Sequence, residues 1–101
     1  MSDVFVEVVI NVADASAIGI ESRDEIEDPL EEALSASGLG EVTGGGGGMG
    51  VYIIDVEAVE QQFDDALLVI RQALQALNVP TSTRIKRRTP ISVEFLVYEA
   101  P

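Results

Sequence analysis

The chain contains no cysteine, no histidine and no tryptophan among its 101 residues. Without cysteine and histidine it has no disulfide, no thiolate nucleophile, no zinc site of the usual ligand set and no serine–histidine–aspartate triad. The commonest general base is missing as well. We therefore expect a protein that is not an enzyme and has no catalytic residues, no cofactor and no metal site.

Basic residues are also few, with six against eighteen acidic ones and a formal net charge of −12. Residues 1–70 contain sixteen of the eighteen acids and a single base, Arg23. Four bases lie together in the sequence RIKRR, from Arg84 to Arg88. A net anion repels nucleic acid and acidic membrane surfaces and attracts basic proteins. We expect a basic protein partner, no free nucleic acid and no membrane.

Long apolar runs are absent too. The longest, such as residues 66–70 and 95–98, are far shorter than the roughly 20 residues of a membrane helix. The first residues, MSDVFVEVV, place an acid where a secretory signal has a basic residue followed by an apolar stretch. The length suits one core, built from the 47% of hydrophobic residues. A single cytoplasmic domain over residues 1–101 is the expectation.

Alternating apolar residues predict the strands. In residues 4–12, VFVEVVINV, alternate residues are apolar, which is typical of a half-buried strand. Residues 51–59, VYIIDVEAV, repeat the pattern. A long glycine turn over residues 44–48 would join this strand to residues 39–43 as a hairpin. Closing strands are expected from residues 81–87 and 90–99.

Two helices are expected. Apolar residues recur at spacings of three and four over residues 60–77, which indicates an amphipathic helix. The sequence DPLEEALSASG predicts another, in which Asp28 caps the start, Pro29 is the first helical residue and Gly38 ends the helix. A start at Ser22 is the alternative, but it would place Pro29 inside the helix at a cost of about 3 kcal/mol. We favour the later start.

The predicted order is β-α-β-β-α-β with a further C-terminal strand, and residues 13–27 form a loop with one helical turn. This is the ferredoxin-like, split β-α-β arrangement of the α+β class, an antiparallel sheet with two helices on one face. The valine-rich face would lie under the helices. The opposite face would carry apolar side chains among acids.

Those apolar side chains predict a surface for self-association. A soluble monomer rarely leaves such a patch bare, so the face would form a homodimer or bind another protein. The alternative is that the last strand or residues 13–27 cover it. The predicted self-association residues are Phe5, Val9, Val51, Ile53, Leu96 and Tyr98.

The five consecutive glycines, residues 44–48, raise the question of phosphate binding. A phosphate loop needs glycines that open a helix, usually with a nearby lysine. Here the glycines precede a strand, and no basic residue lies between Arg23 and Arg71. We therefore favour a soft hairpin turn. The alternative is a flexible tip that a partner orders, with Met49 as an apolar contact.

Two further clusters admit a functional and a structural interpretation. The pair Asp55 and Glu57, like Asp64 and Asp65, could hold a cation, but the spacing is generic and solvated positions are the better interpretation. The RIKRR cluster could bind nucleic acid, but no aromatic residue is interleaved with it. It is more consistent with bases that brace acids on the first strand or the hairpin, or that dock one end of a partner.

The stretches LEEALSASGLGEVTGGGGGMGVYIIDVE and ALLVIRQALQALNVPTSTRI resemble a group of small, mostly uncharacterised bacterial proteins that contain GLGEVTGGGTGMG and DIDVE. Some of these look like immunity proteins found beside polymorphic toxins. The similarity covers residues 30–85 and implies a fold family more than an activity, with no catalytic residues to carry over. This chain has plain glycines where a threonine or serine is expected, so it lacks that hydroxyl.

Two functions follow as expectations. The first is a small acidic, non-enzymatic binding protein that neutralises or regulates a basic protein partner, as an immunity protein neutralises a toxin. The alternative is a structural or assembly protein that forms homo-oligomers through its open sheet face. The predicted partner-binding residues are Glu41, Met49, Tyr52, Asp55 and Glu57.

Overall fold

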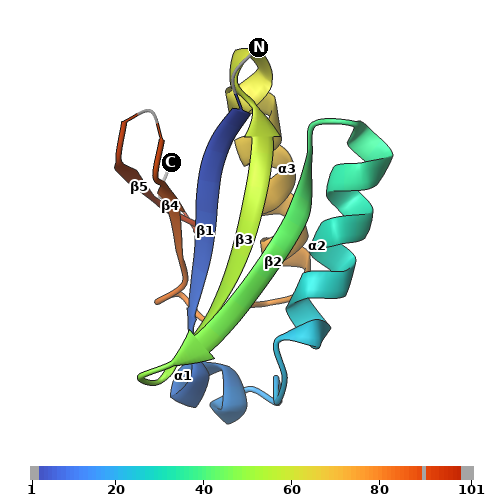
Figure 1. Ribbon diagram of the computed structural model, residues 1–101. Helices are drawn as coiled ribbons and strands as arrows, with labels where there is room; N and C mark the ends of the chain where they lie inside the picture. Colours follow the sequence, from blue (N-terminus) through green and yellow to red (C-terminus); the bar gives the residue numbers. More distant parts are fainter. Residues whose placement is uncertain (1–2, 90, 99–101) are drawn as a thin grey trace.

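The computed structural model describes residues 3–89 and 91–98. In this part of the chain five strands form one antiparallel sheet in the order β2-β3-β1-β4-β5, with α3 behind it (Figure 1). The predicted α+β class is confirmed, whereas the ends of the predicted domain 1–101 and of the segment 90–99 lie outside the described residues. The elements are β1 (Asp3–Asn11), α1 (Val12–Ala17), α2 (Asp24–Ser37), β2 (Gly40–Gly48), β3 (Val51–Val59), the 3-10 helix η1 (Glu60–Gln62), α3 (Phe63–Ala76), β4 (Arg84–Arg87) and β5 (Val93–Leu96).

The core lies between one face of the sheet and the helices. Successive side chains of a strand point to opposite faces, so the even-numbered residues of β1 and β3 share one face. That face is the buried one, which confirms the predicted alternation. Its fully or almost fully buried residues are Val4, Val6, Val8 and Ile10 of β1, Ile54, Val56 and Ala58 of β3, and Ile85 of β4.

Helix α3 matches its predicted periodicity. It follows η1, begins at Phe63 and ends at Ala76, and its apolar side packs on the sheet. Beyond the helix, Asn78 takes a positive φ of 57°, and Pro80 follows two residues later. The buried residues of α3 are Phe63, Ala66, Leu67, Ile70 and Leu74.

Helix α2 starts at Asp24, so the predicted start at Asp28 is wrong and Pro29 lies inside the helix. The Glu25 carboxylate accepts the backbone N–H groups of Glu21 and Ser22, each at 2.8 Å, which holds the chain at the helix entry. The additional turn also buries Ile26 completely. Burial of an isoleucine contributes about 1.5–3 kcal/mol, which offsets much of the cost of the internal proline.

The predicted loop over residues 13–27 is helical at both ends. Helix α1 is capped by Asn11, whose side-chain oxygen accepts the N–H of Asp14 at 2.9 Å. Ala15 of α1 is buried, so the short helix closes one end of the core. The start of α2 takes up the last residues of the predicted loop.

The hairpin of β2 and β3 is confirmed, but its predicted turn is wrong. The five glycines are strand residues paired with β3, and the turn is made by Met49 and Gly50, with φ of 52° and 82°. Positive φ at both central residues is typical of the type I′ turn that suits hairpin twist. Ladder hydrogen bonds involve only the backbone, so β3, a strong strand, can pair with glycines despite their low strand propensity.

The last strand, β5, pairs with β4 and its chain then crosses to α3. Phe95 lies against Phe63, with ring centroids 5.8 Å apart, and Val97 is fully buried. The carbonyl of Val97 accepts a hydrogen bond from Gln75 of α3 at 2.8 Å. The predicted closing strands are therefore present, and the second of them seals the end of the core.

Candidate protein-binding surface

The side of the sheet away from the buried core is its open face, which carries the odd-numbered residues of β1 and β3. The strand register sets which side chains share a row across it. One row runs from Glu41 through Glu57 to Phe5, and the next joins Asp55 to Glu7. The second row continues to Lys86 of β4 and Glu94 of β5. Acids and apolar residues therefore alternate on this face, as the sequence predicted.

Four carboxylates gather at the β2 side of the open face: Asp3, Glu41, Asp55 and Glu57, here called the acidic corner. Glu41 lies directly opposite Glu57, and Asp55 is in the neighbouring row. None of the four forms an ion pair with another described residue. The register therefore brings together three of the predicted partner-binding residues, and adds Asp3, which sequence reasoning missed.

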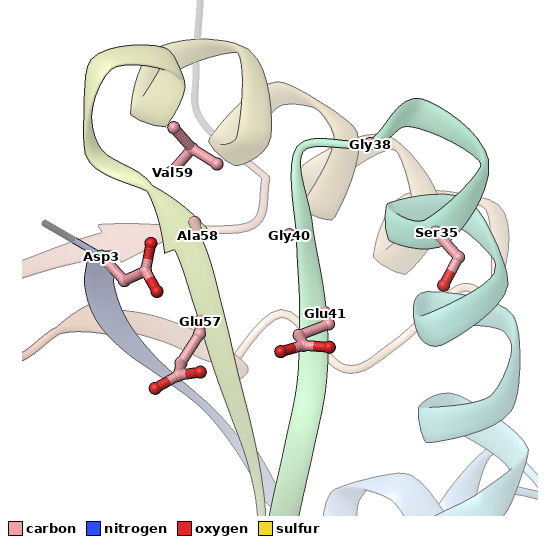
Figure 2. A pocket seen from close by; sticks show the side chains of 8 residues that line it. All are labelled: Asp3, Ser35, Gly38, Gly40, Glu41, Glu57, Ala58 and Val59. Atoms are coloured by element: carbon pink, nitrogen blue, oxygen red, sulfur yellow. The ribbon is translucent and has the colours of Figure 1, made fainter. Parts of the chain in front are cut away.

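An open pocket of about 260 Å³ lies in this corner (Figure 2). The carboxylates of Asp3, Glu41 and Glu57 project at it from β1, β2 and β3. It also borders the C-terminal end of α2, a helix with no basic residue in its last turn. The carbonyl end of a helix carries a partial negative charge, so helix and carboxylates together favour a cation. The lining residues are Asp3, Ser35, Gly38, Gly40, Glu41, Glu57, Ala58 and Val59.

The pairing of Glu41 with Glu57 works against the stability of the free protein, because like charges directly opposite on neighbouring strands repel. We expect Glu57→Gln to raise the free energy of unfolding by about 0.5 kcal/mol at low salt. The gain should shrink at high salt, since screening weakens the repulsion that the variant removes. Urea unfolding at both salt concentrations measures it. A loss of stability at low salt would show that Glu57 is not repelled.

The basic cluster occupies the other side of the open face. The Arg88 guanidinium donates to the Glu7 carboxylate, with 2.6 Å between Nε and Oε1, so the predicted bracing of acids on the first strand is confirmed. Arg84 and Lys86 each lie 3.9 Å from Glu94. Arg87 points to the buried side, where its guanidinium lies 4.8 Å from the Phe63 ring centroid. The open face is thus negative at β2 and β3 and positive at β4.

Two predicted partner-binding residues lie away from the acidic corner. Tyr52 is half-buried on the helix side of β3, and its hydroxyl donates to the Glu21 carbonyl at 3.0 Å. Tyr52 therefore lies on the other face of the sheet from the acids, and its role as an anchor for a partner stays a prediction. Met49 is fully exposed, but it lies in the turn at the far end of the hairpin from Glu41. A surface that used both the corner and the turn would have to follow the whole length of β2.

The predicted self-association residues are on the open face, with one exception. Phe5 and Leu96 are 46% and 43% exposed, and Val9 lies opposite Ile53. Val51 is half-buried beside the turn. The exception is Tyr98, whose hydroxyl donates to the Val79 carbonyl beyond α3 at 2.7 Å.

Tyr98 therefore turns toward the chain beyond α3, and its predicted place on the open face is wrong. Burial raises the pKa of the Tyr98 phenol, which agrees with its place as a hydrogen-bond donor. The reason lies in the chain beyond β5, which leaves the sheet and crosses to α3, where strand alternation no longer sets the direction of a side chain.

Within residues 3–89 and 91–98, no group of three or more acids is arranged to hold a metal ion. Asp64 and Asp65 lie in the first turn of α3, where acids favour the positive end of the helix dipole. This agrees with their interpretation as ordinary helix-start residues. No helix in the same described ranges has the length and apolar character needed to cross a membrane.

Comparison with known proteins found no match: no protein-family model, no curated protein and no solved structure is significantly similar to the chain.

Proposed function

We propose that the protein is a non-enzymatic binding module that holds a basic surface of another protein at its acidic corner. The observation that carries the proposal is the opposition of Glu41 and Glu57, with Asp3 and Asp55 beside them and no base among the described residues to neutralise them. An arrangement that costs stability in the free protein is typical of a functional site. A lysine or arginine of a partner would relieve the repulsion.

The resemblance to immunity proteins supports the same function, because neutralising a basic toxin requires an acidic binding surface and no catalysis. The proposal includes a cytoplasmic location for the protein. We also propose a ferredoxin-like assignment for the fold. The order β2-β3-β1-β4, with β1 and β3 central, supports it, and β5 is then an addition at one edge.

The test compares two triple variants that change the net charge equally. In the first, Glu41→Gln, Asp55→Asn and Glu57→Gln remove charge from the acidic corner. In the control, Asp24→Asn, Asp28→Asn and Glu32→Gln remove it from an exposed stripe of α2. Both leave a net charge of about −9, so any difference between them is local.

With a basic partner captured from the source organism, we expect the corner variant to associate several-fold more slowly and with a weaker dependence on salt. Complementary charges close to an interface accelerate encounter, and charges beyond about 8 Å are screened at physiological ionic strength. The control should associate nearly as fast as the parent. Stopped-flow or surface-plasmon measurements over a salt series give both rates. If association slows equally in the two variants, only the net charge of the protein matters, and the acidic corner is not the binding site.

The exposed apolar residues of the open face favour a second candidate, assembly of identical subunits through this face. Phe5 and Leu96 are the observation behind it, since both are large, apolar and nearly half exposed. If assembly occurs, Ile53→Lys should shift the protein to a monomer in sedimentation velocity, because it places a charge in the middle of the apolar patch that the assembly would bury.

The matched control for assembly is Leu68→Lys, an exposed apolar residue on α3 outside the open face. It should leave the sedimentation coefficient unchanged. Circular dichroism of both variants establishes that the fold is retained. A parent protein that sediments as a monomer at high concentration would remove this second candidate.

A further inference from the structure

Strand β2 is an edge strand, and half of its outer edge is open. Near its start the edge is occupied by α2, where the Glu31 carboxylate accepts the N–H of Val42 at 2.7 Å. A register shift, or bulge, follows between Val42 and Gly44. From there to the turn the strand continues as glycine, with no side chain to cover its outer edge.

The hydrogen-bond pattern identifies the open groups. In an antiparallel ladder, residues alternate between pairs that exchange hydrogen bonds and residues whose N–H and C=O point away. The turn pairs Gly48 with Val51, so Gly46 and Gly44 also bond to β3. Gly45 and Gly47 therefore point outward, and no described residue donates to them or accepts from them. These outward groups of Gly45 and Gly47 are called the open edge.

The other edge of the sheet, formed by β5, is protected. Strand β5 has four residues, and the carbonyls of Leu96 and Val97 accept hydrogen bonds from Arg71 and Gln75. Proteins usually protect an edge with a short strand, a charged side chain or a proline, because a bare edge pairs with other chains. The open edge of β2 is not short and has no proline or charged residue of its own, and its bulge lies before it, not within it. A charged group does lie beside it on the helix side, where the Arg23 guanidinium is close to Gly45.

We propose that the open edge of β2 binds an extended segment of a basic partner as a sixth, antiparallel strand. The inference rests on the proposed function for the chemistry of the partner and adds the way in which the partner is held. Main-chain hydrogen bonds to Gly45 and Gly47 would supply affinity, and alternate side chains of the segment would supply specificity.

Charge complementarity selects this occupant over a second copy of the chain. Acids lie on the open face and at the start of the strand: Asp55 is opposite Gly44, and Glu41 and Glu31 lie beyond the bulge. On the helix side of the open edge, the charge beside Gly45 is that of Arg23. A second copy would bring the same acids and a net charge of −12 to the contact. A basic segment would instead neutralise them.

The two sides of the open edge also predict a sequence pattern in the segment. On the open face, a Cβ at Gly46 would meet nothing within 4 Å, so long side chains can lie there and reach Asp55. On the helix side, the Arg23 guanidinium carbon lies 3.2 Å from the position of a Cβ at Gly45. The space on the helix side is therefore small, and the Arg23 guanidinium gives it a positive charge. The segment should therefore alternate a lysine or arginine with a small or β-branched apolar residue.

The experiment uses capped peptides of alternating lysine and valine and measures binding to the whole protein by calorimetry. In an antiparallel register the valines lie opposite Gly45 and Gly47, so their N–H groups make the ladder. A peptide methylated on the valine nitrogens should bind at least about tenfold more weakly than one methylated on the lysine nitrogens, which lie at the outer edge. The two peptides have the same charge and the same number of methyl groups. Equal affinities would overturn the inference.

Amide hydrogen exchange in the protein gives a second readout. The unmodified basic peptide should slow exchange of the Gly45 and Gly47 amides, whereas Gly46 and Gly48 should already be slow. Gly47→Pro should weaken the peptide at least about tenfold relative to Gly47→Ala, because both add a Cβ and only proline removes the outward N–H. If Gly47→Pro does not fold, the methylated peptides still decide the question.

The outcomes separate this inference from the proposed function. Binding of the basic peptide without protection of Gly45 and Gly47 overturns the edge strand and leaves the basic partner in place. Equal protection by a peptide of alternating glutamate and valine supports the edge strand and overturns the preference for a basic partner. If Gly45 and Gly47 are protected in concentrated protein without any peptide, the open edge pairs with a second copy of the chain. If none of the peptides binds, the inference is overturned.

Discussion

Replacing Pro29 with alanine is expected to raise the free energy of unfolding by about 2 kcal/mol. Pro29 is the sixth residue of α2, so its missing N–H leaves the Glu25 carbonyl without its helical partner, and its ring crowds that carbonyl. Alanine restores the hydrogen bond and has the highest helix propensity. Urea unfolding followed by circular dichroism measures the change.

The control for this prediction is Glu32→Ala, because Glu32 is exposed and lies about one turn after Pro29 in α2. It should change the free energy of unfolding by no more than about 0.5 kcal/mol, because surface substitutions outside special features have small effects. If Pro29→Ala leaves stability unchanged or lowers it, then the proline ring, which is half-buried, packs well enough to offset the lost hydrogen bond.

Alanine at two neighbouring glycines of β2 should change stability in opposite directions. A Cβ at Gly45 would lie 2.6 Å from the carbonyl oxygen of Ile53, closer than real contacts allow, and 3.2 Å from the Arg23 guanidinium. Since the backbone must shift to admit it, we expect Gly45→Ala to lower the free energy of unfolding by about 1–3 kcal/mol. A Cβ at Gly46 meets nothing within 4 Å, so Gly46→Ala should raise it by about 0.5–1 kcal/mol.

The pair is its own matched control, because both variants make the same chemical change one residue apart. Thermal unfolding of the two proteins in one buffer gives the comparison. A loss at both positions would mean that the strand requires glycine throughout, and a gain at both would mean that the β2–β3 ladder yields without cost. The first result would contradict the open space at Gly46, and the second would contradict the close approach at Gly45.

The glycines connect stability to the proposed function. A glycine in a strand costs roughly 0.5–1 kcal/mol relative to alanine, so β2 is the weakest part of the sheet by propensity. It is held by β3 on one side and, at its start, by Glu31 on the other. A strand of low local stability with free backbone groups can gain order from a partner. The acidic corner begins on the same strand, which places charge and open edge side by side.

Local periodicity determined much of the fold. The alternation in β1 and β3 and the spacing in α3 are properties of a few consecutive residues, and a strand or helix must bury its apolar side wherever it packs. The α+β class and the hairpin are therefore predictable without a structure. The same holds for most of the core, including Val6 of β1, Ile54 of β3 and Ile70 of α3, all of which are fully buried.

The tertiary structure decided the features in which local preference and packing disagree. Glycine disfavours a strand and proline a helix interior, yet the backbone of β3 pairs with the glycines and the burial of Ile26 extends α2 past Pro29. The site depended on the same long-range terms. Its acids come from three strands, from Asp3 to Glu57, and a bulge of one residue sets which of them meet. Strand register is set by the pairing of all residues in the ladder together, so the opposition of Glu41 and Glu57 could not be inferred from either strand alone.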